Sequence, residues 1–261
     1  MDVRLEGGAG TLEAWLAMPP SPGHSGRPGM IIVPGFPAAP GGGPNSFRTF
    51  PGLADRVAED ARMVALTFAF RGISQSAGDF SLAGWRDDLR VAISYLRTVD
   101  GIDGAIWMMG FGTGGALAIA AAADEPDVAG IVSMAAPADF QDWASRPREL
   151  LSHARRCGAI SDPSFPKDMS QWSGELSEIS AVQSAAKLDP ETVRLMVLHG
   201  SNDNAVPPLD ARAIADAHGA AELRLIEGAR HHLRHDPRSM ATAIGFLNRR
   251  GRAPKSSTLA S

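Results

Sequence analysis

The segment between residues 105 and 123 constrains the fold more than any other part of this chain. Ala105 to Met109 is a short apolar run typical of a buried parallel strand, and Gly114 to Ala123 is an alanine-rich run typical of a packed helix. The residues between them, Gly-Phe-Gly-Thr-Gly at 110 to 114, favour a tight turn because glycine tolerates backbone conformations that other residues avoid. The segment therefore predicts a strand, a sharp turn and a helix in direct succession.

This glycine-rich pentad has the frame of a G-x-S-x-G nucleophile elbow, with Gly112 where the serine stands in that motif. An elbow needs small residues on both sides of its central position, because that residue is strained and the following helix packs close. Gly110, Gly114 and Gly115 meet this need. The pentad thus predicts an elbow without its nucleophile.

Two later segments follow apolar runs in the order expected for an acid and a histidine. His-Gly-Ser-Asn-Asp-Asn-Ala-Val-Pro at 199 to 207 follows the apolar run 193–198, and Gly-Ala-Arg-His at 228 to 231 follows the run 223–226. With these segments the chain resembles the α/β-hydrolase superfamily, in particular its serine-peptidase and esterase-like branch with an H-G-x-x-D-x-x-V-P acid loop. The resemblance implies Asp203 as the acid and His231 as the base, with Gly112 at the nucleophile position.

Two further motifs support the resemblance, which covers roughly residues 10 to 250. Met-Ile-Ile-Val-Pro-Gly-Phe-Pro at 30 to 37 looks like the strand and oxyanion loop of the family, with Pro34 in place of its histidine. The backbone N–H groups of Phe36 and Thr113 would then form the oxyanion hole. Residues 71–78 are similar to the family's R-G-x-G-x-S-x-G turn.

Strand-like and helix-like segments alternate along most of the chain. Strands are predicted at 11–18, 30–33, 62–69, 105–109, 128–135, 193–198 and 223–226, and helices at 47–60, 82–99 and 114–123. Such alternation predicts an α/β fold: a mostly parallel twisted sheet with helices on both faces. The 261 residues, 44% of them hydrophobic, suit a single domain, and the resemblance implies that it is the α/β-hydrolase fold. The terminal residues 252–261 lack periodicity and predict a disordered tail.

The alternation stops between residues 137 and 188, so this segment is interpreted as a helical insertion. It carries the aromatic residues Phe140, Trp143, Phe165 and Trp172. The resemblance implies a lid over the pocket that sets substrate choice. The alternative is that these aromatic side chains only hold a surface helical hairpin together.

Glycine at 112 has no hydroxyl group, so no acyl-enzyme can form there, and ordinary serine-hydrolase activity is predicted to be absent or very weak. Thr113 and Cys157 are the alternative nucleophiles, but neither is favoured, because Thr113 is expected to supply its backbone N–H and a lone cysteine is usually inert. A water activated by Asp203 and His231 would instead allow hydrolysis of a small ester, amide or other carbonyl substrate. The alternatives are a non-catalytic pseudohydrolase that binds a small hydrophobic ligand, or a scaffold for a protein partner. The sequence leaves open whether Gly112 is natural or engineered.

Composition excludes several other classes. A net charge of −4 gives no electrostatic case for nucleic acid, and no apolar run is long enough for a membrane span. One cysteine and no leader-like start predict a cytoplasmic protein. No cofactor is implied, although residues 110–115 read alone would also suit a dinucleotide-binding turn. The histidines at 231–235 do not have the spacing of metal ligands, so no metal site is predicted. Asp87 and Asp88 are predicted to lie on a solvated helix face. The oligomeric state stays open, with a homodimer as one option.

Overall fold

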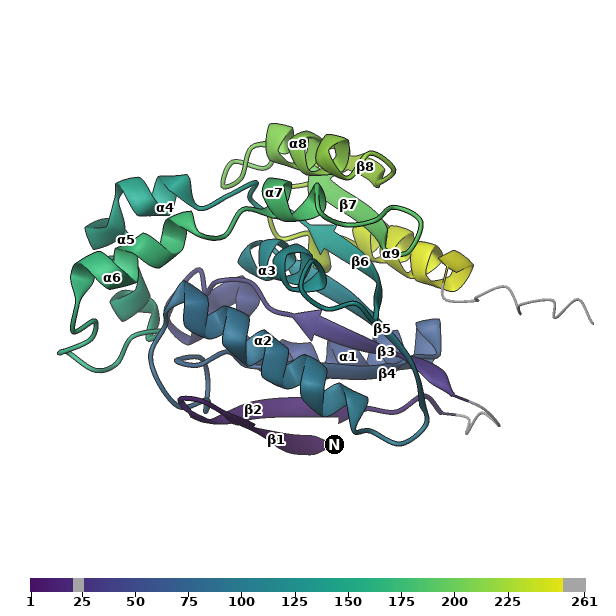
Figure 1. Ribbon diagram of the computed structural model, residues 1–261, viewed down its shortest axis with the longest axis horizontal. Coiled ribbons are helices and arrows are strands. Elements are labelled where there is room, and N and C mark those ends of the chain that lie inside the picture. Colours follow the sequence, from purple (N-terminus) through teal and green to yellow (C-terminus); the bar gives the residue numbers. More distant parts are fainter. Residues whose placement is uncertain (21–25, 251–261) are drawn as a thin grey trace, which may run out of the picture.

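The computed structural model describes residues 1–20 and 26–250, in which eight strands form one sheet in the order β1-β2-β4-β3-β5-β6-β7-β8 (Figure 1). The strands are β1 Asp2–Gly7, β2 Gly10–Ala17, β3 Arg27–Val33, β4 Val64–Phe68, β5 Ile102–Phe111, β6 Val128–Met134, β7 Arg194–Gly200 and β8 Glu222–Ile226. β1 and β2 pair antiparallel with their neighbours, and all the pairings from β4 to β8 are parallel. A mostly parallel sheet is therefore confirmed.

Helices cover both faces of this sheet (Figure 1). On one face lie α2 Leu82–Arg97, α3 Thr113–Ala122, α7 Ala181–Ala185 and α8 Pro208–His218; on the other lie α1 Phe50–Ala61 and α9 Pro237–Arg250. Two apolar clusters fill the spaces between the sheet and the helices on its two faces. One includes Trp85 and Leu117, and the other includes Phe50 and Phe246. The strand β4 is buried along its whole length, which explains why its sequence is apolar except for Thr67, whose hydroxyl donates to the Ile32 carbonyl at 3.1 Å. Within the described residues no helix has the length and apolarity that crossing a bilayer requires.

Several elements differ from the sequence predictions, three of them for a clear physical reason. β1 was not predicted, since its alternating charged residues belong to an edge strand with little burial. The helix predicted from residue 47 begins as the short 3₁₀ segment η2 Phe47–Thr49 before α1. β4 starts later than predicted because Arg62 takes a left-handed conformation (φ 56°) that ends α1. α9 begins at Pro237, where the fixed φ of proline suits a first helical residue, and Asp236 accepts the backbone N–H of Arg238 at 2.8 Å.

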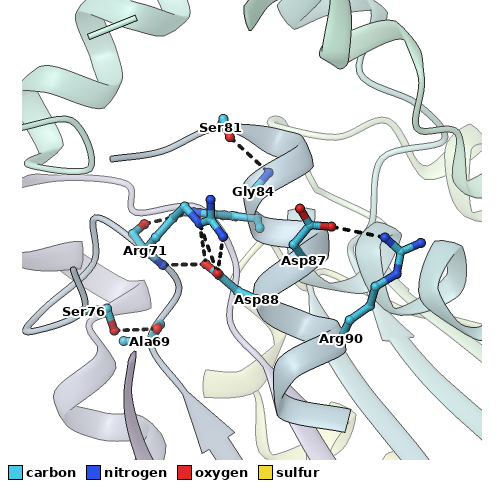
Figure 2. Close-up of polar contacts among 9 residues, drawn as sticks. Ala69, Arg71, Ser76, Ser81, Gly84, Asp87, Asp88 and Arg90 are labelled. Carbon is cyan, nitrogen blue, oxygen red and sulfur yellow. Dashed lines mark hydrogen bonds and ion pairs between the residues drawn. The ribbon is translucent and has the colours of Figure 1, made fainter. Parts of the chain in front are cut away.

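One prediction about α2 is wrong. Asp87 is exposed as predicted, but the Asp88 side chain is completely buried against Arg71, in the turn that follows β4 (Figure 2). Asp88 accepts hydrogen bonds from the Arg71 guanidinium at 2.6 to 3.1 Å and from its backbone N–H at 2.9 Å. A buried carboxylate is tolerated because this single partner satisfies both of its oxygens.

The segment 137–188 contains α4 Gln141–Ser145, α5 Pro147–Cys157, α6 Met169–Gly174 and η3 Glu175–Ser177 ahead of α7. Helices α4, α5 and α6 lie together at one end of the sheet, on the left in Figure 1. The segment is bonded to the loop before α2: the Trp172 indole N–H donates to the Phe80 carbonyl at 3.0 Å, and the backbone N–H of Ser161 donates to Asp79 at 2.5 Å. The predicted tail at 252–261 lies outside the described residues.

Candidate active site

The parallel topology brings the segments predicted to carry chemistry to one edge of the sheet. Phe36 follows β3, Gly112 follows β5, Asp203 follows β7 and His231 follows β8. The carboxyl ends of parallel strands meet at the same edge, which is where α/β proteins place their sites. Four segments separated by up to 195 positions therefore share one location.

Gly112 forms the sharp turn between β5 and α3, with φ 52° and ψ −123°. This backbone conformation is unfavourable for residues with a side chain. A β-carbon at this position would lie 3.5 Å from Nε2 of His231 and 3.8 Å from its Cε1, which is ordinary contact distance. Position 112 thus faces the histidine, and the space in front of it would accept a small side chain.

The turn packs directly against the loop after β3. A β-carbon on Gly114 would lie 2.2 Å from the Pro34 carbonyl oxygen and 2.5 Å from that of Val33, so only glycine allows this approach. The approach brings Phe36 to the start of α3. The backbone N–H groups of Phe36 and Thr113 have no hydrogen-bond partner within residues 1–20 and 26–250, and both residues line one cavity with Gly112. Thr113 is the first residue of α3, whose N-terminal end favours negative charge.

Asp203 and His231 are hydrogen-bonded to each other. Oδ2 of Asp203 lies 2.9 Å from Nδ1 of His231, and its Oδ1 accepts the backbone N–H groups of Ala205 at 2.9 Å and Val206 at 3.0 Å. Burial by itself would raise the pKa of Asp203, but these bonds and one from His199 hold it well below its usual range. Asp203 is therefore an ionised acceptor, so Nδ1 of His231 carries the proton and Nε2 is left as a base.

His199 begins the acid loop, and no role was predicted for it. Its side chain is fully buried, and Nε2 lies 3.2 Å from Oδ2 of Asp203 and 3.0 Å from the Val206 carbonyl. Nε2 therefore donates its proton between these two oxygens, and Nδ1 is left without a partner in the described part of the chain. His199 holds the acid loop against the end of β7.

A cavity of about 700 Å³ opens above Gly112. The aromatic side chains of Phe36, Phe140 and Trp143 line it, and polar residues surround them. The rings of Phe36 and Trp143 lie 5.2 Å apart, and His153 of α5 stacks on Phe36 at 5.7 Å. The arrangement suits a small ligand with an apolar part and a carbonyl group directed to Gly112.

Two of the four aromatic residues predicted for the pocket lie elsewhere. Trp172 is 3% exposed and belongs to the apolar core, because its indole N–H is bonded to the Phe80 carbonyl under the insertion. Phe165 packs on the same core, and neither residue lines the cavity. Of the four, Phe140 and Trp143, at the start of the insertion, line the cavity.

The cavity also contains residues that the sequence did not single out: Asn45, His153, Asp210 and Arg230. Arg230 directly precedes His231 in the histidine segment, which is a local signal for its place at the site, whereas Asn45, His153 and Asp210 carry no motif of their own. His232, the residue after His231, also lines the cavity. Its pKa is lowered by burial and by the charges of His231, His235 and Arg234, so this histidine is neutral near neutral pH.

Of the two alternative nucleophiles, Thr113 lines the cavity and Cys157 does not. Burial raises the pKa of Cys157, despite the opposing charge of Arg156, and this residue does not line the cavity. In the described part of the chain no three metal-ligating side chains come together.

No family model and no curated protein matches this chain. Solved structures match over nearly the whole length. They include an α/β serine hydrolase without lid from Xanthomonas campestris (19% identity, TM-score 0.65, 98% of this chain and 96% of that one). Est1E from Butyrivibrio proteoclasticus with ferulic acid bound has 21% identity and a TM-score of 0.74, over 95% and 98% of the two chains. GrgF, an α/β hydrolase from Penicillium sp. sh18, has 21% identity and a TM-score of 0.71, over 96% and 98%.

Proposed function

We propose, from the premise that this chain has the α/β-hydrolase fold, that it hydrolyses a small ester, amide or related carbonyl compound with a water as nucleophile. Asp203 and His231 act as the base pair, and the amides of Phe36 and Thr113 act as the oxyanion hole. One observation carries the proposal: Nε2 of His231, oriented by the bond from Nδ1 to Asp203, lies 3.5 Å from where a β-carbon of residue 112 would be. The base is thus aimed at the nucleophile position although no side chain is there.

The proposed reaction proceeds in two steps without a covalent intermediate. Nε2 of His231 takes a proton from the water while the water oxygen bonds to the carbonyl carbon, and the carbonyl oxygen becomes an oxyanion held by the two backbone N–H groups. The oxyanion then re-forms the carbonyl, the bond to the leaving group breaks, and His231 returns the proton to that group. The products are a carboxylic acid and an alcohol or amine.

The helical insertion is proposed to select the substrate as a lid. The aromatic side chains Phe140 and Trp143 come from its first part and face the same cavity as Phe36. Aromatic and apolar groups are therefore the preferred substituents of the substrate. Since Est1E has been crystallised with ferulic acid, aromatic acid esters belong in the test panel.

A second candidate is a non-catalytic binder of a small carbonyl ligand. The same cavity of about 700 Å³ and the same unbonded amides support it, because both would hold a carbonyl group without any reaction. The two candidates differ only in whether His231 removes a proton.

The test compares the protein as it stands with the Gly112→Ser, Gly112→Ala and His231→Ala variants on short, medium and aromatic p-nitrophenyl esters. We expect turnover by the unmodified protein, with at least roughly 10²-fold loss in His231→Ala. Gly112→Ala adds the β-carbon of serine without its hydroxyl, so it separates the effect of the nucleophile from that of backbone strain. Turnover confined to Gly112→Ser would contradict the water mechanism and favour the ligand binder.

A further inference from the structure

A second, much smaller hollow lies beside the catalytic residues. It has a volume of about 10 Å³ and is bounded by Asn45, Gly112, His231 and His232, among others. One water needs about 10–15 Å³ of such space and two or more polar partners. The hollow therefore has the size of a single water and adjoins the position that a serine side chain would approach.

Three polar side chains, Asn45, His231 and His232, line both this hollow and the large cavity, and Asn45 is the one that lies outside the histidine loop. Its Nδ2 donates to the Phe36 carbonyl at 2.8 Å, which fixes the orientation of the amide group. Oδ1 accepts no hydrogen bond from the described residues. Asn45 thus has an acceptor without a partner in the described part of the chain, while its donor holds the oxyanion loop and the residue lines the same hollow as Gly112.

The neighbouring residue fixes Asn45 relative to His231. The Pro44 carbonyl accepts hydrogen bonds from Nε2 of His235 at 2.9 Å and from the Arg234 guanidinium. Arg234 also donates to Thr49 at 2.7 Å and lies over the Phe50 ring at 4.4 Å. Burial lowers the pKa of Arg234 to about 10, so the guanidinium remains charged at neutral pH. The loop that carries Asn45 is therefore bonded to the loop that carries His231.

We propose that Asn45 is a positioning residue that, with His231, holds the nucleophilic water beside Gly112. Oδ1 of Asn45 accepts one water proton and Nε2 of His231 accepts the other, which is the proton removed in the reaction. With both protons directed to the protein, a lone pair of the water oxygen is left to attack the carbonyl carbon. The inference rests on the proposed function, since it assigns the site of the water which that function requires.

The experiment introduces Asn45→Ala into the unmodified protein and into the Gly112→Ser background. In the unmodified protein, ester turnover depends on the positioned water, and we expect kcat to fall by roughly 10²-fold. In the Gly112→Ser background, the measured quantity is the rate of covalent labelling by a fluorophosphonate, which needs the serine, the base and the oxyanion hole but no water. We expect a loss at least tenfold smaller there. Asn248→Ala, on α9 where Nδ2 donates to the Asp60 carbonyl at 3.3 Å, is the matched asparagine control.

Each result has a distinct meaning. Equal losses in the two backgrounds would show that Asn45 acts only through the Phe36 loop, and an unchanged kcat in the unmodified protein would show no role; both overturn the inference while leaving the proposed function intact. No turnover by the unmodified protein would overturn the proposed function, and the inference with it. A crystal structure adds a readout independent of activity: an ordered water within about 3.2 Å of both Asn45 Oδ1 and His231 Nε2 is expected, and side chains closing the hollow would contradict the proposal.

Discussion

Replacing Asp88 with asparagine should destabilise this protein severely, although the substitution changes only one atom of the side chain. Asp88 is completely buried, and it accepts three hydrogen bonds from the Arg71 guanidinium and one from the Arg71 backbone (Figure 2). An asparagine in its place would direct an NH₂ group at these donors and leave the 15% exposed Arg71 cation without a counter-charge.

The expected loss in the free energy of unfolding follows from the burial of this ion pair. Removing one partner of a buried ion pair costs about 3–5 kcal/mol, whereas an exposed pair contributes about 0–1 kcal/mol. The whole domain is stabilised by only about 5–15 kcal/mol. For a chain of this size each kcal/mol corresponds to about 2–4 °C, so the expected fall in Tm is roughly 6–20 °C.

The adjacent residue on the same helix provides the control. Asp87 is 59% exposed and pairs with Arg90 at 3.1 Å, so Asp87→Asn makes the same chemical change in water (Figure 2). Urea denaturation followed by circular dichroism would give the free energy of unfolding of the protein and both variants. If Asp88→Asn lost less than about 1 kcal/mol, as Asp87→Asn should, the argument from burial and unpaired charge would be refuted.

Three further predictions concern other parts of the chain. Gly114→Ala should lower the free energy of unfolding by about 1–3 kcal/mol, because its β-carbon would lie 2.2 Å from the Pro34 oxygen; Gly52→Ala, where a β-carbon meets no atom within 4 Å, is the control in the same urea assay. Cys157 should react with iodoacetamide at pH 7.5 far more slowly in the folded protein than in urea, since burial raises the pKa of its thiol; equal rates would contradict that burial. Glu175→Gln should raise the free energy of unfolding at pH 7, because burial raises the pKa of this carboxyl and its ionised form opposes folding. The gain should vanish below the unfolded-state pKa of about 4.3, and a gain that is independent of pH would exclude this cause.

The sequence by itself determined the elements whose signals lie within a few neighbouring residues. The apolar runs at 105–109 and 193–198 became β5 and β7, and the glycines at 110–114 became the turn before α3. These patterns are readable because a buried parallel strand is apolar along its length, and because close backbone contacts leave no room for a β-carbon at Gly110 and Gly114. The resemblance of the elbow, the acid loop and the histidine loop to those of the α/β-hydrolase superfamily then implied its fold.

Only the tertiary structure decided which side chains meet between those elements. Asp88 is buried because Arg71 reaches it from another segment, and Trp172 packs into the core because the Phe80 carbonyl lies beneath it. Asn45 lines the site because Arg234 and His235, about 190 positions away, hold its loop. Periodicity along a helix or strand reports which face is buried, but the partner of a polar group depends on segments that fold back from elsewhere in the chain.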